Sequence, residues 1–124
     1  MKYLGIDWGQ KRIGLSTGDS EAKIAIPFGV ASNPSEILEI IKKEEISAVV
    51  LGDPREMCGG ESRLAGEFNY FKKYLEEKSG LLVELVDERL TSKEADSLPG
   101  GKKLKASRDA VAAMLILQAY FDKT

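Results

Sequence analysis

The distribution of apolar and polar positions predicts short strands followed by alternating helices and strands. Apolar residues dominate segments 2–7, 12–17 and 22–30, and turn-forming residues separate them, which predicts a meander of three strands. Two later apolar runs, at 46–51 and 81–86, are typical of strands that are covered on both faces. Segments with helical spacing separate and follow these two runs.

Three helices are predicted from their start and stop signals. Asn33 suits an N-cap, Pro34 the first helical position and Glu36 a capping-box acid, so a helix begins here. A second helix runs from about 61 to 79, ends at Gly80, and carries an apolar stripe of Leu64, Phe68, Phe71 and Leu75. The last, capped by Ser107, runs from Arg108 to about 122 and is apolar nearly all the way round. A short helix near 92–97 and a mobile loop at 99–103 complete the prediction.

The predicted order, β-β-β-α-β-α-β-α, indicates an α/β fold with a five-stranded mixed sheet and helices on its faces. The length of 124 residues predicts one domain, 1–124. Right-handed crossovers place the fourth and fifth strands beside the first. The ends of three strands, at Asp7, Gly52 and Asp87-Glu88, then meet at one rim, where ligands of such sheets usually bind.

Composition narrows the chemistry of that rim. The chain is 43% hydrophobic and 31% charged, with a net charge of −2, so any nucleic-acid contact must depend on local charge. It has no histidine, which excludes Ser-His-Asp and Cys-His catalysis and every His-ligated metal site. The single cysteine, Cys58, excludes an internal disulfide and fits a reducing compartment. Without a signal pattern or a membrane-spanning run, we expect a soluble, cytoplasmic protein with no membrane contact.

The first motif, from Leu4 to Ser16, reads as two antiparallel strands with Asp7 at the mouth of the turn. Gly9 in the turn would either take a positive φ or allow a close approach to the backbone. Glu88, at another strand end, and Asp109, at the start of the last helix, could converge on Asp7. Three carboxylates repel one another unless a cation joins them, and Mg²⁺ or Mn²⁺ suits such oxygen ligands.

Each acid also has a simpler interpretation. Asp7 could be a turn acid, Glu88 could pair with Arg89 or Lys93, and Asp109 could only complement the helix dipole. The three together, on separate elements of one rim, favour a shared site.

Four short motifs in order resemble the YqgF/RuvX family of RuvC-like Holliday-junction resolvases and pre-16S rRNA nucleases. They contain Asp7, Gly9, Arg12 and Gly14; Gly52 and Pro54; Asp87, Glu88, Arg89 and Thr91; and Asp109, Ala112 and Ala113. The resemblance implies an RNase H-like fold with Asp7, Glu88 and Asp109 as catalytic, metal-binding carboxylates. The central loop departs from the family pattern at Asp53, Arg55 and Cys58.

Basic residues near these acids are candidates for phosphate contacts. They are Lys11, Arg12, Arg89, Lys103, Lys105 and Arg108. The basic run from Lys102 to Arg108 could equally be a solvated loop.

We therefore predict a metal-dependent nuclease of the two-metal-ion type that hydrolyses phosphodiesters in structured nucleic acid. The resemblance implies pre-rRNA or branched DNA as substrate, the ribosome as a further partner, and a monomer or a homodimer. A non-catalytic nucleic-acid or ribosome-binding module is the alternative. An ATP-binding phosphotransferase is disfavoured, because those enzymes need a second domain and a second phosphate loop.

Overall fold

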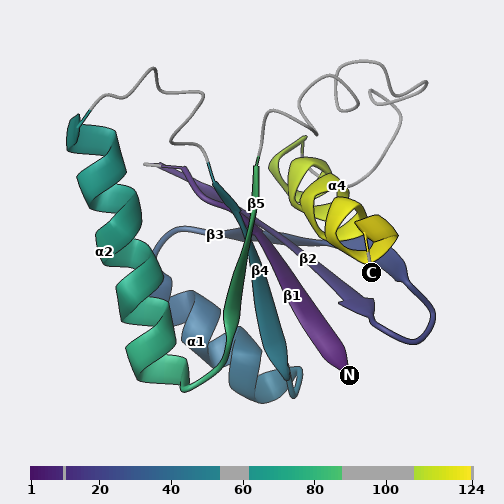
Figure 1. The fold of residues 1–124 in the computed structure, drawn as a ribbon. Helices are drawn as coiled ribbons and strands as arrows, with labels where there is room; N and C mark the ends of the chain where they lie inside the picture. Colours follow the sequence, from purple (N-terminus) through teal and green to yellow (C-terminus); the bar gives the residue numbers. More distant parts are fainter. Residues whose placement is uncertain (10, 54–61, 88–107, 124) are drawn as a thin grey trace.

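The computed structural model describes residues 1–9, 11–53, 62–87 and 108–123, which form a five-stranded sheet with helices on both faces (Figure 1). The strands are β1 (Lys2–Asp7), β2 (Ile13–Asp19), β3 (Ile24–Ala31), β4 (Ala48–Asp53) and β5 (Val83–Asp87). The helices are α1 (Pro34–Lys43), α2 (Ser62–Ser79) and α4 (Arg108–Lys123). Residues 54–60 of the central loop, the predicted loop at 99–103 and the short helix near 92–97 lie outside the described residues.

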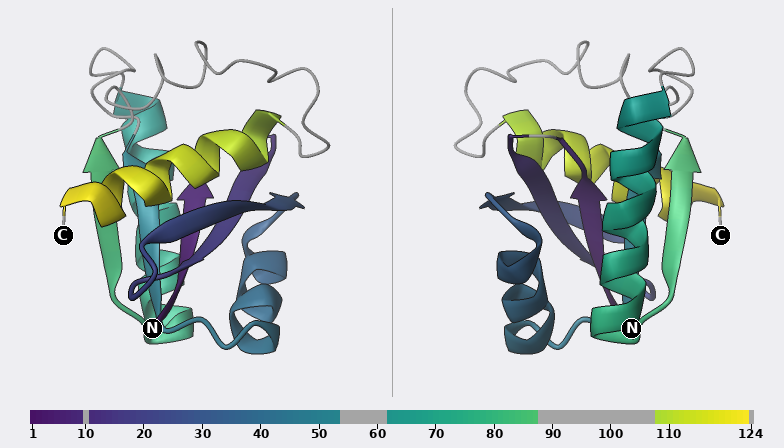
Figure 2. Two further views of the ribbon diagram at one scale, coloured as in Figure 1. Left: turned by 90° about the vertical axis from the view of Figure 1, so that its right-hand side faces the viewer. Right: turned by 90° about the vertical axis from the view of Figure 1, so that its left-hand side faces the viewer.

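The strand order β3-β2-β1-β4-β5 confirms the predicted mixed sheet. β1, β2 and β3 form an antiparallel meander, β4 pairs in parallel with β1, and β5 pairs in parallel with β4. Consequently β1, β4 and β5 all end at one edge of the sheet, and α4 begins at that edge (Figure 2).

β1 has the predicted bounds, whereas the boundaries of the other four strands differ from the predicted ones by one or two residues, because burial and strand pairing do not coincide. Ile46 was predicted to open β4, and it is buried, yet the strand begins two residues later. Before it, the Ser47 backbone N–H donates to the Lys2 carbonyl at 2.7 Å. Leu82 was predicted to lie in β5, but it precedes that strand and is exposed.

Alternation along the strands divides the core between the two faces of the sheet. On one face, Leu4 and Ile6 of β1 pack with α1 and α2, whose buried residues include Ile37, Phe68, Phe71 and Leu75. On the other face, Val50 of β4 and Val86 of β5 pack with Ile116, Leu117 and Phe121 of α4. Figure 2 shows α4 and α2 on opposite sides of the sheet. The predicted apolar stripe on α2 is confirmed at Phe68, Phe71 and Leu75, which are buried. The side chain of Leu64 is not among those that the structure describes.

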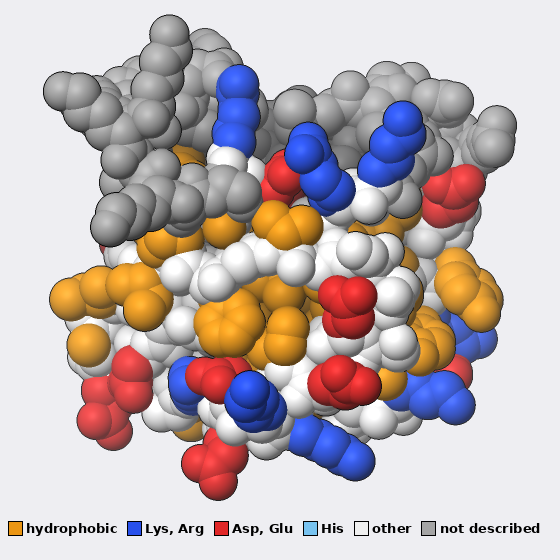
Figure 3. All heavy atoms as spheres, turned by 180° about the vertical axis from the view of Figure 1, so that it is seen from behind, with side chains coloured by type: hydrophobic (Ala, Val, Ile, Leu, Met, Phe, Trp, Pro, Cys, Tyr) orange, Lys and Arg blue, Asp and Glu red, His pale blue; other side chains and the backbone are white. Residues whose placement is uncertain are grey.

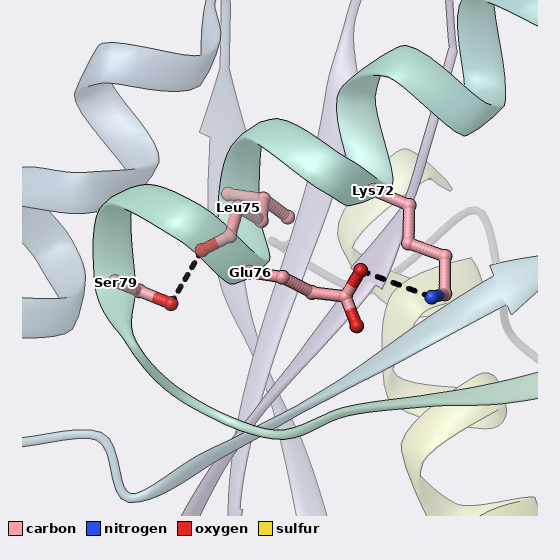
Figure 4. A network of polar contacts seen from close by, with 4 residues as sticks. All are labelled: Lys72, Leu75, Glu76 and Ser79. Carbon is pink, nitrogen blue, oxygen red and sulfur yellow. Dashed lines mark hydrogen bonds and ion pairs between the residues drawn. The ribbon is translucent and has the colours of Figure 1, made fainter.

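The helix ends follow the predicted signals. The Asn33 side chain accepts a hydrogen bond from the Glu36 backbone N–H, as an N-cap does. Gly80 ends α2 with a φ of 70°, a conformation that glycine adopts without strain. In the last turns of α2, the Ser79 hydroxyl donates to the Leu75 carbonyl at 2.5 Å, next to the Lys72–Glu76 ion pair at 3.1 Å (Figure 4).

Helix α4 lies unusually close to the sheet because small residues of β1 and β2 face it. A Cβ on Gly5 would come within 2.9 Å of the Ala113 carbonyl oxygen, and one on Gly18 within 2.7 Å of the Phe121 ring. Between these glycines, Ser16 is fully buried, and its hydroxyl donates to the Ala113 carbonyl at 2.8 Å. The helix was predicted to be apolar nearly all round, and its buried residues do lie around most of its circumference. They are Ala110, Val111, Ala113, Leu115, Ile116, Leu117 and Phe121.

We predict that Ser16→Ala lowers the free energy of unfolding by about 1–2 kcal/mol, because the buried Ala113 carbonyl loses its hydroxyl donor. Ser47→Ala, at an exposed serine, is the control and should change it by less than about 0.5 kcal/mol. Denaturant unfolding of both variants measures the difference. Equal stability of the two variants would show that the Ser16 hydroxyl does not hold α4.

Candidate metal centre

Asp7 ends β1 and belongs to the face of the sheet that carries α4. Its neighbours Ile6 and Trp8 both point the other way, since both pack in the core beneath α1 and α2. Trp8 lies edge-on to Phe68 of α2, with 5.9 Å between the ring centroids. Alternation along the strand therefore directs the half-buried Asp7 toward the side of the sheet where α4 begins.

Gly14 brings the start of α4 to this position. It is the cross-strand partner of Asp7 on β2. A Cβ added to Gly14 would lie only 1.9 Å from the carbonyl oxygen of Asp109, so the first turn of α4 rests directly on this glycine. Asp7 and Asp109 thus lie at the same corner of the molecule, although 102 positions separate them in the sequence. Of the three predicted carboxylates, the described structure places these two together.

Asp109 forms an ion pair with Arg12. Arg12 Nε lies 3.2 Å from Asp109 Oδ2, and the two side chains are 73% and 29% exposed. Asp109 also occupies the first turn of α4, where the partial positive charge of the helix favours a carboxylate. Arg12 was predicted to contact phosphate, and in this structure it neutralises one of the candidate metal ligands.

Other basic side chains lie near the two acids. Lys11 is exposed in the β1–β2 connection beside Arg12, and Arg108 is exposed at the start of α4. Figure 3 shows Lys and Arg side chains near the top of the face opposite to that of Figure 1, with acidic side chains beside some of them. The corner therefore combines carboxylates with exposed cations, although the net charge of the chain is −2.

The structure of the turn decides between the two predicted roles of Gly9. No positive φ is found at Gly9, so the alternative prediction, a close approach to the backbone, is the correct one. A Cβ at Gly9 would meet the Arg12 carbonyl oxygen at 2.6 Å. Gly9 therefore lets the chain fold back tightly, which brings Arg12 close to the end of β1.

Four predicted site residues lie outside the described residues: Glu88, Arg89, Lys103 and Lys105. Within the described ranges, no three carboxylate, imidazole or thiol side chains gather closely enough to hold a metal ion. β5 ends at Asp87, the residue before Glu88. A complete set of three acids therefore requires Glu88, and its role stays a prediction.

Sequence reasoning missed the role of the small residues beneath α4. Gly14, Ser16 and Gly18 alternate along β2 and so share one face, and Gly5 of β1 joins them. This alternation of small residues in a strand was a readable signal that a backbone approaches closely. Asp53 and Asp87 were named separately in the sequence analysis, but not as a second pair of acids. They are register partners at the same edge, but alternation places them on the α2 face.

The donor set fits a hard divalent cation. Two carboxylates from separate elements meet at one corner, and the chain has no histidine that would favour zinc. The oxygen donors of Asp7 and Asp109 are of the kind that Mg²⁺ or Mn²⁺ prefers. The first turn of α4 lies so close to Gly14 that a Cβ would not fit between them. This contact constrains the position of Asp109 relative to β2.

Comparison with known proteins agrees with this arrangement. A family model described as RuvX, Holliday junction resolvase, matches residues 1–123. The chain belongs to the RuvX family. A relative from Chlamydia caviae is 37% identical over 136 residues, which cover 98% of this chain and 83% of the relative. One from Endomicrobium trichonymphae is 37% identical, covering 98% and 95%. Both carry the name "Putative pre-16S rRNA nuclease".

Solved structures of RuvC share the fold of this RuvX-family chain. Thermus thermophilus RuvC in complex with a Holliday junction substrate matches with a TM-score of 0.64 at 18% identity. The match covers 99% of this chain and 94% of that RuvC chain. A second T. thermophilus RuvC structure gives a TM-score of 0.63 at 16% identity. The predicted RNase H-like fold is therefore confirmed. Among the described helices of the RuvX-family chain, none is long and apolar enough to span a membrane.

We predict that Gly14→Ala lowers the free energy of unfolding by about 2 kcal/mol or more, because the new Cβ would overlap the Asp109 backbone. Gly29→Ala on β3 is the matched control, since a Cβ there meets nothing within 4 Å and should change stability by less than about 1 kcal/mol. Thermal or denaturant unfolding checks both. If the Gly14 variant were as stable as the Gly29 variant, α4 would not depend on Gly14 for its position.

Proposed function

We propose that this RuvX-family protein is a divalent-metal-dependent nuclease that hydrolyses phosphodiester bonds in structured nucleic acid. The single observation that supports the site most strongly is the contact of the α4 start with Gly14, which brings Asp109 to the corner where β1 ends in Asp7. Glu88 is the third proposed carboxylate, because it follows β5, which ends at the same edge.

Asp7, Asp109 and Glu88 act as catalytic residues by binding the cation. Two divalent cations bound there would supply Lewis acidity for the phosphate and an activated water, which is the two-metal-ion mechanism that we propose. The protein contributes two carboxylates on rigid elements, which limits the rearrangement needed when the cation binds. The ion pair with Arg12 adds a positive charge at the same corner.

Exposed cations next to the acids are the proposed phosphate contacts. Lys11, Arg12 and Arg108 lie near the two acids, and their exposure leaves them accessible to a nucleic-acid backbone. We also assign phosphate contacts to the cations outside the described residues, Arg89, Lys103 and Lys105. Arg89 is proposed as a bidentate clamp on the scissile phosphate.

We propose structured RNA as the first substrate class and branched DNA as the second. The relatives at 37% identity are named for pre-16S rRNA, whereas the family description and the RuvC neighbour refer to Holliday junctions. The RuvC likeness, at 18% identity, supports the fold and not the substrate. We further propose that residues 1–124 act as one nuclease domain, and that the ribosome is a partner during rRNA maturation.

We predict that Asp7→Asn abolishes cleavage while the protein stays folded, because the change removes a charged ligand and keeps the side-chain size. Labelled pre-16S rRNA 5′ segments and four-way DNA junctions, incubated with Mg²⁺ or Mn²⁺, give the rates. Asp53→Asn is the matched control, since Asp53 also ends a strand at this edge but on the α2 face, and should cleave at the wild-type rate.

Wild-type cleavage by Asp7→Asn would contradict the assignment of the site. The alternative of a non-catalytic binding module predicts a different pattern. In that case wild type would never cleave in either cation, and binding of RNA or DNA would survive the Asp7→Asn and Asp109→Asn double substitution.

A second prediction concerns the basic run beyond Pro99. Charge reversal at Lys103 and Lys105 should weaken substrate binding and reduce the slope of log affinity against log salt by about one for each phosphate that the protein no longer binds. The same reversal at Lys42 and Lys43, exposed at the end of α1, is the control and should leave the slope unchanged. Fluorescence anisotropy across a salt series measures it. An unchanged slope in the Lys103 and Lys105 variant would show that these lysines do not contact phosphate and are only solvated surface residues.

A further inference from the structure

Arg12, in the β1–β2 turn, forms an ion pair with Asp109 of α4. Its Nε lies 3.2 Å from Asp109 Oδ2, and 73% of the Arg12 side chain is accessible to solvent. Arg12 directly precedes β2, whereas Asp109 lies in the first turn of α4. The guanidinium therefore contacts one of the two carboxylates that meet at the candidate metal centre.

An ion pair with this exposure is weak and readily exchanged. Solvent screens the attraction, and fixing a long side chain costs conformational entropy, so such pairs usually stabilise by no more than about fivefold in an equilibrium constant. Asp109, by contrast, is held on α4, whose first turn rests on Gly14. When the pair breaks, the arginine is therefore the partner that moves.

Arg12 and a divalent cation would compete for the same carboxylate. Once a cation takes up the Asp109 charge, the neighbouring guanidinium faces a like charge and loses its partner oxygen. A guanidinium carries five N–H donors in a planar fork that matches phosphate oxygens. Nucleic-acid phosphate is then the anion that best replaces Asp109.

We infer that Arg12 is an exchangeable counter-ion that neutralises Asp109 in the cation-free protein and transfers to a nucleic-acid phosphate when the divalent cation binds. This inference rests on the proposed function and adds to it a coupling between metal loading and substrate binding. By linkage, each ligand strengthens the binding of the other by the same factor. Since the exchanged pair is exposed, the factor is about two- to fivefold.

The first test titrates Mn²⁺ alone into wild type, Arg12→Gln and a control by calorimetry. Without its competitor, the Arg12→Gln protein should bind Mn²⁺ about two- to fivefold more tightly than wild type. Lys2→Gln is the matched control, because the half-buried Lys2 also forms an ion pair at the surface, with Glu44 at 3.0 Å, but at the opposite end of β1. It should titrate as wild type does. Weaker Mn²⁺ binding by Arg12→Gln would overturn the exchange, since Arg12 would then be positioning Asp109 for the cation.

The second test measures nucleic-acid affinity by anisotropy, without Mn²⁺ and with saturating Mn²⁺. The probe is a fluorescein-labelled RNA hairpin with phosphorothioate linkages, which slow its cleavage, and a gel confirms that it stays intact. Mn²⁺ should strengthen RNA binding about two- to fivefold more in wild type than in Arg12→Gln. Arg12→Lys keeps the charge but not the planar fork, so it should titrate Mn²⁺ like wild type and show a smaller RNA gain.

The outcomes separate the two proposals. If wild type binds Mn²⁺ and RNA, but Arg12→Gln shows the same Mn²⁺-dependent gain, the exchange is wrong and the nuclease site stands. If wild type binds neither ligand, both the exchange and the proposed function are wrong. Thermal unfolding of all variants, expected to match wild type for these exposed residues, confirms that changes in binding do not result from loss of fold.

Discussion

The close contact between α4 and the sheet is the constraint on which the candidate site depends. Side chains larger than hydrogen at Gly5, Gly14 or Gly18 would collide with α4 or with neighbouring strands, so these positions let the helix lie against the sheet. Ser16 adds a directional contact, because its buried hydroxyl donates to the Ala113 carbonyl. Close packing of this kind transmits small changes in position, so the distance of Asp109 from β1 is set by residues that carry no charge.

Negative and positive charges at this corner partly offset each other. Two carboxylates on fixed elements would repel each other, and the Arg12 guanidinium and the positive end of α4 offset part of that repulsion. A divalent cation would replace this weak compensation with a stronger one. If the proposed function holds, the cation and the exposed basic side chains together would allow this acidic protein to bind a polyanion at one local site.

Much of the fold could be predicted, because local signals and packing agree. Asn33 marked the start of α1, because its side chain accepts a hydrogen bond from a backbone N–H of the first turn. Gly80 marked the end of α2, because it adopts a positive φ. Both signals depend only on nearby residues. The convergence of Asp7 and Asp109 followed from strand order and the start of the last helix. The Arg12–Asp109 pair could not be predicted, since it depends on how closely α4 approaches β2, which involves residues almost a hundred positions apart. The predicted strand boundaries at Ile46 and Leu82 were wrong, because an apolar residue need not belong to a strand.

Diffraction from crystals soaked in Mn²⁺, recorded with the manganese anomalous signal, tests the central claim most directly. The account predicts an anomalous peak bound by carboxylate oxygens of both Asp7 and Asp109, with Gly14 still in contact with the first turn of α4. A peak that contacts only one of these acids, or a manganese ion bound elsewhere with none at this corner, would contradict the claim that α4 packing assembles a shared metal site.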